Sequence, residues 1–321
     1  MNQDHQSAAR PLPARENEFY GGYSSVDLER IERVLACAAE PMPGMITDFI
    51  GIRTSPEYLP YAAHLAGNVV ANLPVPDDSL HAETIEYAAL ATVVESMRGD
   101  GFRMLELGAG WGPWLSAAGV LARRRGVRQI HLVGIEADPG RFGFLKRHLA
   151  ANGLRPVGEA DSTIEGSVRC DLFNGAAWWE STVMYFPTVD SANDHGGAAT
   201  THATDADYRG LALAHRPVQA YSVPDLIGRF GPVDFVHVDI QGGEFELLSH
   251  SIDVLRRSVR FLFVGTHSRK IEGDLIALLL DAGFRLQNEK PCRFDATTPR
   301  PTLEGMTTRD GSQFWCNDTL A

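Results

Sequence analysis

The stretch MLELGAGWGPW, Met104 to Trp114, joins an apolar run to a turn with a glycine at every second position. These glycines are Gly108, Gly110 and Gly112. The apolar run predicts a short buried strand over residues 102–108, and Pro113 is suited to the first turn of a following helix. A strand that enters a helix through glycines is typical of α/β proteins that bind nucleotide-like cofactors. We therefore expect a cofactor at this turn.

The alternation of strand and helix continues along the chain. Further apolar runs predict strands over residues 129–137, 162–168, 234–240 and 260–267, the second of them weaker. Helical patterns cover residues 113–126, 138–153, 243–258 and 272–284. The segments RLQNEK and GSQFWCND near the end are expected to pair as antiparallel strands. This order predicts an α/β fold with a mostly parallel sheet and helices on both of its faces.

Residues 19–98 show helical patterns and almost no strand pattern. The expected helices cover residues 25–39, 59–73 and 77–97. Ser24 and Asp27 have the spacing of a capping box for the first helix, and residues 77–79, Asp-Asp-Ser, supply an N-cap for the third. We expect a helical extension that acts as a lid, as part of a ligand pocket or as a dimer interface.

The extension lies between a tail and the cofactor domain. Residues 1–18 are polar and contain proline, and we expect a flexible tail. The cofactor domain covers residues 99–321. Within it, residues 189–210 are rich in Ala, Thr, Asp and Gly and are expected to be a long surface insertion. Such loops are usually either functional or disordered, and the sequence leaves both open.

Composition excludes some classes of partner. Lys and Arg total 29 against 41 Asp and Glu, a net charge of −12, which argues against nucleic acid or an anionic membrane as partner. The four cysteines form no CxxC pair, so a zinc site or a disulfide framework is not expected. No apolar run approaches the roughly 20 residues of a membrane span. We expect a cytoplasmic protein.

The glycine turn departs from the patterns that bind diphosphates. A dinucleotide fingerprint is G-x-G-x-x-G, and Pro113 occupies the position of its third glycine. Trp111 places a bulky side chain where a pyrophosphate needs open backbone. No G-K-[ST] follows, which excludes a Walker loop.

Two acids beside the turn favour S-adenosylmethionine instead. Glu106 ends the first strand, where a carboxylate beneath the turn is suited to the cofactor's ammonium group. Glu136 ends the second strand, where an acid is suited to the two ribose hydroxyls. The predicted cofactor-binding residues are Glu106, Gly108, Gly110, Trp111, Gly112, Glu136 and Asp239. A tight turn with no ligand is the structural alternative.

With these residues the chain resembles class I S-adenosylmethionine-dependent methyltransferases. More narrowly, it resembles the FkbM family of O-methyltransferases over about residues 100–318, through DFVHVDIQGGEFELL (234–248), FVGTHS (263–268) and the closing DGSQFW. The resemblance implies a Rossmann-like seven-stranded sheet with one antiparallel strand. It also implies methyl transfer to a hydroxyl of a sugar, glycoside or polyketide-type natural product.

The chain departs from the commoner family form K-I-D-x-E-G-x-E. His237 stands for the Lys and Gln241 for the second acid, so roles that rest on those two residues do not carry over. Asp239, Gly242 and Glu244 match the pattern.

Asp239, His267 and Glu244 are the predicted catalytic residues. The crevice of an open parallel sheet lies at the carboxyl ends of its strands, where the strand order reverses, so Asp239 and His267 should face the methyl group. His267 has a suitable ordinary pKa for a base that removes the hydroxyl proton, and Asp239 would orient it or act itself.

Several alternatives stay open at this point. Asp239, Gln241 and Glu244 offer oxygen atoms that suit a hard cation, so a divalent metal is an alternative that we do not favour. Each predicted catalytic residue also has a structural alternative. Asp239 could cap the following helix, Glu244 could interact with the helix dipole, and His267 could be a structural residue.

Other candidates are ambiguous. His237 fits a core position better than a catalytic one, and the Trp178-Trp179 pair suits either a sugar face or apolar packing. Three residues of the third helix have a spacing that suits either contact with the cofactor from above or a solvated face: His81, Glu83 and Glu86. We leave them out of the predicted site residues, with Glu83 the nearest to inclusion.

The sequence thus predicts an S-adenosylmethionine-dependent O-methyltransferase with a small hydroxylated acceptor. The partners expected are that acceptor and a second copy of the chain in a homodimer, with no nucleic acid and no membrane. An NAD-linked oxidoreductase and a non-catalytic cofactor-binding regulator are the two alternatives.

Overall fold

The computed structural model describes residues 21–71, 82–154, 162–165, 168–297 and 300–320. Its main strands are β4 (Gly101–Leu107), β5 (Gln129–Glu136), β6 (Ser162–Glu165), β7 (Val168–Asn174), β11 (Val233–Val238), β12 (Val259–Thr266), β13 (Arg285–Lys290) and β16 (Gly311–Cys316). They form one sheet in the order β13-β16-β12-β11-β4-β5-β7-β6.

The strand directions confirm the predicted sheet. The strands β7, β5, β4, β11 and β12 run parallel. The strand β16 is antiparallel to both β12 and β13, which confirms the predicted terminal pair. Seven strands therefore have the directions expected of the sheet, six of them at the predicted residues, and β6 adds an eighth at the edge, antiparallel to β7.

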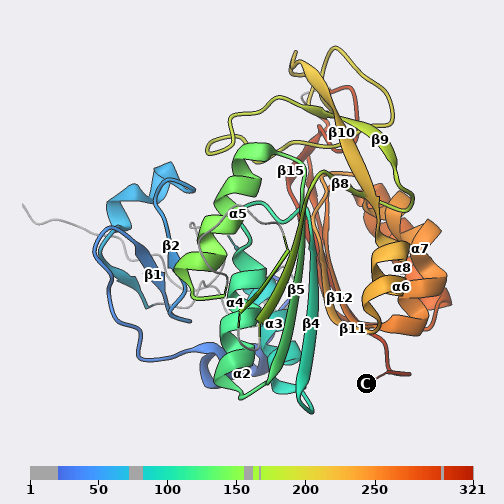
Figure 1. The fold of residues 1–321 in the computed structure, drawn as a ribbon. Helices are drawn as coiled ribbons and strands as arrows, with labels where there is room; N and C mark the ends of the chain where they lie inside the picture. Colours follow the sequence, from blue (N-terminus) through green and yellow to red (C-terminus); the bar gives the residue numbers. More distant parts are fainter. Residues whose placement is uncertain (1–20, 72–81, 155–161, 166–167, 298–299, 321) are drawn as a thin grey trace, which may run out of the picture.

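Helices cover both faces of this sheet (Figure 1). The helices α2 (Ser25–Leu35), α3 (Thr84–Glu95), α4 (Pro113–Arg124) and α5 (Pro139–Ala151) lie on one side. The helices α6 (Val223–Phe230), α7 (Glu244–Ser258) and α8 (Arg269–Asp281) lie on the other. Side chains alternate along each strand, so Met104 belongs to the apolar cluster on the α4 side and Leu105 to the cluster on the α7 side.

The third parallel strand differs from the prediction. We expected it at residues 162–168, but β6 is the first arm of a hairpin and β7 is the parallel strand. Arg169 and Asp171 interrupt the apolar pattern of β7. They are accommodated because the Asp171 carboxylate accepts hydrogen bonds from Arg169 and from His131, both at 2.6 Å.

The N-terminal region contains short strands that the sequence pattern did not predict. These are β1 (Ile46–Asp48), β2 (Arg53–Thr54) and β3 (Val69–Val70), which pair in the order β2-β1-β3. The prediction of a helix over residues 59–73 was wrong. Over its described part, residues 59–71, the one helical element is a short 3₁₀ helix, η1 (Pro60–Leu65), after which the chain turns at Gly67 with φ of +81°.

The other two predicted N-terminal helices form with shifted ends. Ser24 and Asp27 make the expected capping box of α2. The helix α3 begins at Thr84, where Glu83 and Glu86 form the capping box. Residues 77–79, predicted as the N-cap, and the predicted tail 1–18 lie outside the described residues.

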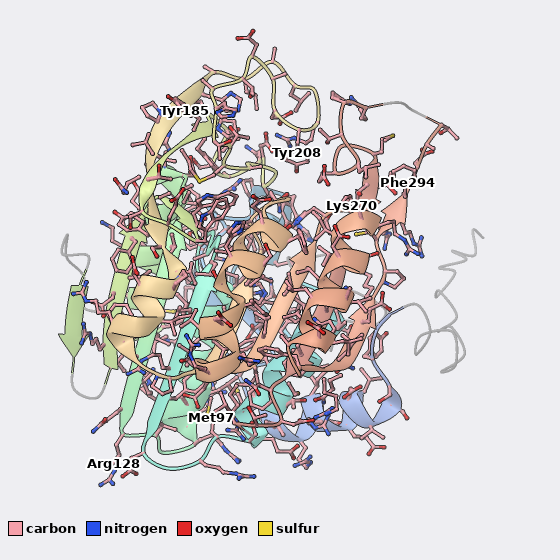
Figure 2. The ribbon with its side chains drawn as sticks, turned by 90° about the vertical axis from the view of Figure 1, so that its right-hand side faces the viewer. Met97, Arg128, Tyr185, Tyr208, Lys270 and Phe294 are labelled. Atoms are coloured by element: carbon pink, nitrogen blue, oxygen red, sulfur yellow. The ribbon has the colours of Figure 1, made fainter. Side chains whose placement is uncertain are left out.

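A second sheet lies above the carboxyl ends of the parallel strands. Its strands β8 (Ala176–Trp178), β9 (Thr182–Pro187) and β10 (His215–Ser222) pair in the order β8-β10-β9. Figure 2 shows Tyr185 and Tyr208 at the end of the molecule opposite Met97 and Arg128. Since Arg128 immediately precedes β5, residues 188–214, which connect β9 to β10, lie at the end where an α/β sheet binds its ligand.

A two-stranded ribbon, β14 (Arg293–Phe294) with β15 (Thr307–Arg309), lies between β13 and β16 in the sequence. No helix among the described residues is long and apolar enough to cross a membrane.

The helix α3 shares the apolar core with the sheet, which leads to a stability prediction. Ile85 is fully buried in the cluster that includes Phe263 and Phe314. We expect Ile85→Ala to lower the free energy of unfolding by about 2–5 kcal/mol, because it leaves a cavity in that core. Urea unfolding followed by circular dichroism measures it, with Val26→Ala, whose parent residue is 59% exposed, as the control. Equal stability of the two variants would show that α3 does not share the core.

Candidate active site

The glycine turn is packed between two neighbouring strands. Gly108 has φ of +77°, and a Cβ there would collide with the backbone carbonyl of Asp239, which follows β11. The amides of Gly108 and Ala109 donate to the carbonyl of Ile135 at the end of β5, at 3.0 and 2.9 Å. Only glycine permits this close approach at position 108. Gly110 has open space where a Cβ would be, so the middle of the turn faces a cavity.

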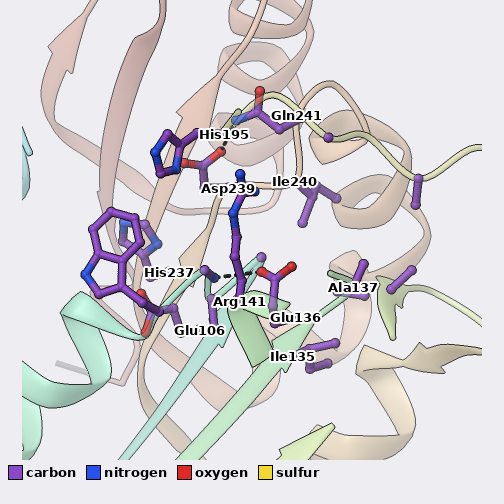
Figure 3. A pocket seen from close by; sticks show the side chains of 18 of the residues that line it. Glu106, Ile135, Glu136, Ala137, Arg141, His195, His237, Asp239, Ile240 and Gln241 are labelled. Carbon is purple, nitrogen blue, oxygen red and sulfur yellow. Dashed lines mark hydrogen bonds between the residues drawn. The ribbon is translucent and has the colours of Figure 1, made fainter. Parts of the chain in front are cut away.

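This cavity has a volume of about 290 Å³ and lies at the carboxyl ends of β4, β5 and β11 (Figure 3). Every predicted cofactor residue except Gly112 lines it: Glu106, Gly108, Gly110, Trp111, Glu136 and Asp239. Gly112 instead serves packing, because a Cβ there would collide with the Leu145 side chain. The structure thus brings the two strand-end acids and the glycine turn around one cavity.

Glu106 is buried beneath the start of α4. Its carboxylate accepts hydrogen bonds from the amides of Trp114 at 3.3 Å and Leu115 at 2.9 Å. Burial raises the pKa of Glu106 to about 7, although these bonds and His237 act against the rise. Near pH 7 this carboxyl group is therefore partly protonated.

Glu136 is bound to the glycine turn itself. Its carboxylate accepts from the amides of Gly110 at 2.7 Å and Asp138 at 2.6 Å. Burial raises the pKa of Glu136 to about 7, against the opposing effect of Arg141. Figure 3 shows Glu136 and Arg141 on the same side of the cavity.

The three predicted catalytic residues form one hydrogen-bonded chain. The Nδ1 atom of His267 lies 2.9 Å from Oε1 of Glu244, and its Nε2 lies 3.2 Å from Oδ1 of Asp239. Glu244 is fully buried and also accepts from the amides of Ile240 and Gly242, at 3.1 and 3.0 Å. The Asp239 side chain remains 43% exposed in the cavity. Glu244 therefore holds the buried end of this hydrogen-bonded chain, and Asp239 is the member that faces the cavity.

The charges in this chain change the role predicted for His267. Burial alone would lower the pKa of His267, but Glu244 and Asp239 outweigh it and raise that pKa well above its ordinary value. Burial would raise the pKa of Asp239, but the hydrogen bond from His267 holds it below its usual range. An imidazolium that donates from both nitrogens has no lone pair to accept a proton. The geometry suits His267 as the residue that orients Asp239, not as the base expected from the sequence.

Gln241 fixes Asp239 from the side of the cavity. Its side-chain amide donates to Oδ1 of Asp239 at 2.9 Å and accepts from the Tyr208 hydroxyl at 3.0 Å. Its backbone has φ of +61°, an uncommon conformation for a residue other than glycine.

The site includes Glu86, which we did not count among the site residues predicted from the sequence. Glu86 lines the cavity, and its Oε1 lies 3.4 Å from Nε2 of His237. Glu83, considered nearer to inclusion, forms an ion pair with Lys290. Helical spacing alone does not distinguish the two residues, because their difference depends on where α3 meets the sheet. His81 lies outside the described residues.

His237 and the Trp178-Trp179 pair, whose roles the sequence left open, lie at the edge of the cavity or next to it. His237 is stacked on Phe263 with ring centroids 5.0 Å apart, and among the described residues its ring nitrogens make no hydrogen bond. Trp178 lines the cavity, whereas Trp179 is stacked on His250 at 4.2 Å. His237 is thus a buried residue that also borders the cavity.

A second cavity of about 410 Å³ adjoins the first. Both cavities are lined by His195, Gln241 and Asp310, so they meet beside Asp239. The walls of the second come from residues 195–211 of the connection between β9 and β10 and from residues 300–310. The N-terminal region contributes Tyr61 and Glu86 to the first cavity.

Asp239, Glu244 and His267 also bear on the question of a metal. Each offers an atom within 4.8 Å of the others, a spacing that a metal ion also uses. Here hydrogen bonds join these atoms, and an imidazolium must lose a proton before it can bind a metal. The chemistry of this set fits a hydrogen-bonded chain better than a cation site, and the expectation of a reaction without a divalent metal stays a prediction.

A sheet of this order, with a glycine turn between two strand-end glutamates, is the architecture of class I S-adenosylmethionine-dependent methyltransferases. The family model described as "Methyltransferase FkbM domain" matches residues 97–286. A relative named "Putative methyltransferase" from Jannaschia sp. (strain CCS1) is 32% identical over 276 residues, 84% of this chain and 94% of the relative. The chain belongs to the FkbM methyltransferase family and is an S-adenosylmethionine-dependent methyltransferase.

Solved structures with similarity to the chain are more distant. The methyltransferase FkbM from Methylobacillus flagellatus KT has 13% identity and a TM-score of 0.40, over 72% of this chain and 54% of that one. The precorrin-6Y C5,15-methyltransferase from Geobacter metallireducens GS-15 has 11% identity and a TM-score of 0.36, over 74% and 89%.

The buried chain of charges predicts a pH-dependent stability. Because the pKa of His267 is raised in the folded protein, its stabilising contribution is complete below its unfolded pKa of about 6.5 and is lost as the pH rises through the folded value. We expect Glu244→Gln to be less stable than the parent by about 1–3 kcal/mol at pH 6. The difference should narrow at alkaline pH.

Urea unfolding across this pH range measures the difference. Glu246→Gln, an exposed change on the same helix, should match the parent protein at every pH. A difference that stays constant with pH would contradict the charged state assigned to His267.

Proposed function

We propose that this enzyme methylates a hydroxyl group of a polar small molecule, with a sugar or glycoside preferred over an apolar polyketide-type acceptor. The observation that carries the proposal is the meeting of two cavities at Asp239: the first has the cofactor residues, and the second is open beside it. Most of the residues that line the second cavity have polar or charged side chains, including Tyr208, Thr307 and Thr308. Such a surface suits an acceptor with many hydroxyl groups.

The first cavity fits S-adenosylmethionine. The open space at Gly110 leaves room for a ligand against the turn. We assign Glu106 to the ammonium group and Glu136 to the ribose hydroxyls, since both carboxylates border the cavity. When bound, the cofactor supplies a methyl group on a positively charged sulfur, which explains why this cavity has acids where a diphosphate site has open backbone.

The chain's own residues then position the acceptor. Asp239 lies at the junction, held by His267 and Gln241, and its negative charge can accept a hydrogen bond from the acceptor hydroxyl. Holding this oxygen in line with the methyl group supplies much of the catalysis in a displacement reaction. Three residues of the connection between β9 and β10, His195, Gly197 and Ala199, line the first cavity.

The remaining expectations belong to the same proposal. The N-terminal region is proposed to complete the cofactor cavity through Tyr61 and Glu86 rather than the acceptor cavity. A cytoplasmic location, a homodimer and a reaction without a divalent metal are also proposed.

The raised pKa values predict that cofactor binding releases protons. Since the pKa of Glu106 is about 7, its carboxyl group is roughly half protonated at pH 7. An ammonium group bound there favours the ionised form, so S-adenosylhomocysteine should bind with release of roughly half a proton from this site. Calorimetric titration in buffers with different ionisation enthalpies measures it. Glu106→Gln should reduce the release, and a release unchanged in this variant would argue against the assigned role.

The acceptor is identified by labelling. The enzyme is incubated with deuterated methyl donor and an extract of the producing cell, and mass spectrometry follows which compound gains the label. We expect an O-methylated polar metabolite, formed equally well with EDTA present. Label on carbon or nitrogen, or binding of NADH in place of S-adenosylhomocysteine, would contradict the proposal.

With that acceptor, Asp239→Asn should lower kcat by about 10²–10³-fold, because the variant lacks the charge that holds the hydroxyl. Asp253→Asn on α7, whose parent side chain is 79% exposed, should retain the parent rate. A noncatalytic regulator would instead show no turnover in the parent protein and unchanged binding in both variants.

A further inference from the structure

His195 lies where the two cavities meet. It belongs to the connection between β9 and β10, and its ring makes an edge contact with Trp111 of the glycine turn, with centroids 5.6 Å apart. It lines both cavities. Figure 3 shows the imidazole at the same end of the first cavity as Asp239 and Gln241. The ring is therefore placed between the cofactor site and the acceptor site of the proposed reaction.

Charged side chains hold this segment on both sides of His195. The Arg141 guanidinium on α5 donates to the carbonyl of Ser191 at 3.0 Å and to the carbonyl of Asp194. The Asp194 carboxylate accepts two bonds from Arg209, at 2.6 and 2.9 Å. A bidentate pair of this kind fixes geometry as well as contributing energy. The segment that carries His195 is thus held by Arg141 on α5 and by Arg209 of the same connection.

The surroundings of His195 keep the ring neutral. Burial and the positive charge of Arg141 lower its pKa below the ordinary value. Asp194, Asp239 and a hydrogen bond with the Ala192 backbone act in the opposite direction without outweighing them. A neutral imidazole has one nitrogen with a lone pair, which a proton acceptor requires.

The other groups at the junction suit this role less well. Both nitrogens of His267 face carboxylates, at 2.9 and 3.2 Å. The pKa of Asp239 is held below its usual range, which makes it a weak base. Asp310 also borders both cavities, and burial raises its pKa, against the opposing effect of His267, whose Nε2 lies 4.0 Å from its Oδ2. A carboxylate starts from an ordinary pKa about 2.6 units below that of an imidazole, so Asp310 is the weaker base of the two.

We propose that His195 is the general base of the methyl transfer, an inference that rests on the proposed function. The acceptor oxygen forms a bond to the methyl carbon while its proton passes to a ring nitrogen of His195. The bond between carbon and sulfur breaks, and its electron pair remains on the sulfur as a neutral thioether. The imidazolium that results is stabilised by Asp194 and Asp239 and later loses its proton to water.

The first test measures protonation directly. Histidine side chains labelled with ¹³C and ¹⁵N are titrated by NMR with and without S-adenosylhomocysteine, and His195→Gln assigns the signal. We expect His195 to be neutral at pH 7 and to shift when the ligand is added, whereas His267 stays protonated. An imidazolium at position 195 at pH 7 overturns the proposal, and this result is read in the parent protein whether or not the variant folds.

The second test uses the acceptor found by labelling. His195→Gln should lower kcat by about 10²-fold or more and abolish the rise of kcat with pH that accompanies deprotonation of the base. Its affinity for S-adenosylhomocysteine should change less than about threefold, because the cofactor residues are intact. His202→Gln, an exposed histidine of the same segment, should match the parent in both respects.

The outcomes separate this inference from the function on which it rests. Parent-like kcat and pH dependence in His195→Gln overturn the role of His195 and leave the methyltransferase proposal standing. A parent protein that binds no S-adenosylhomocysteine, or that labels no hydroxyl, overturns both.

Discussion

Three buried glutamates hold the turns at the carboxyl ends of the sheet, and the site depends on them. Glu106 binds the amides at the start of α4, Glu136 binds the amide of Gly110, and Glu244 binds the amides that follow Asp239. A buried carboxylate is costly unless donors surround it, and here the donors are backbone groups that the turns would otherwise leave unpaired. Each turn therefore has a fixed shape, and the cavity between them exists before any ligand enters.

Much of the sheet follows from local patterns, and the exceptions have identifiable causes. The strands β4, β5, β11 and β12 are apolar runs next to helical patterns, so their existence and order are predictable from single segments. The strand β7 is not predictable in this way because polar residues interrupt its apolar pattern. The Asp171 carboxylate binds Arg169 on the same strand and His131 on the neighbouring strand β5. The short strands β1–β3 are missed because two or three residues are too few to show a period.

The residues of the site also fall into those that local sequence patterns predict and those that they do not. Glu106 and Glu136 are predictable because the end of a strand is a local property and the ends of adjacent parallel strands meet. His195 and Glu86 reach the cavity from a segment far along the chain and from a helix whose docking the sequence does not specify. The charge state of His267 could not be predicted from the sequence for a related reason. It depends on two carboxylates on opposite sides of the ring, one of which, Glu244, is separated from it by 23 residues.

The two halves of the site are stabilised by different interactions, and this separates the chemistry from the choice of acceptor. The cofactor half is built from strand ends between two apolar cores, where a displaced turn would lose ladder hydrogen bonds and packing together. The half that carries His195 is held largely through side chains, chiefly those of Arg141 and Arg209. Such contacts at a partly exposed surface contribute less and tolerate exchange better than a strand ladder. For the proposed function, a fold arranged in this way predicts that changes in residues 188–214 and 300–310 alter the choice of acceptor while the donor geometry stays constant.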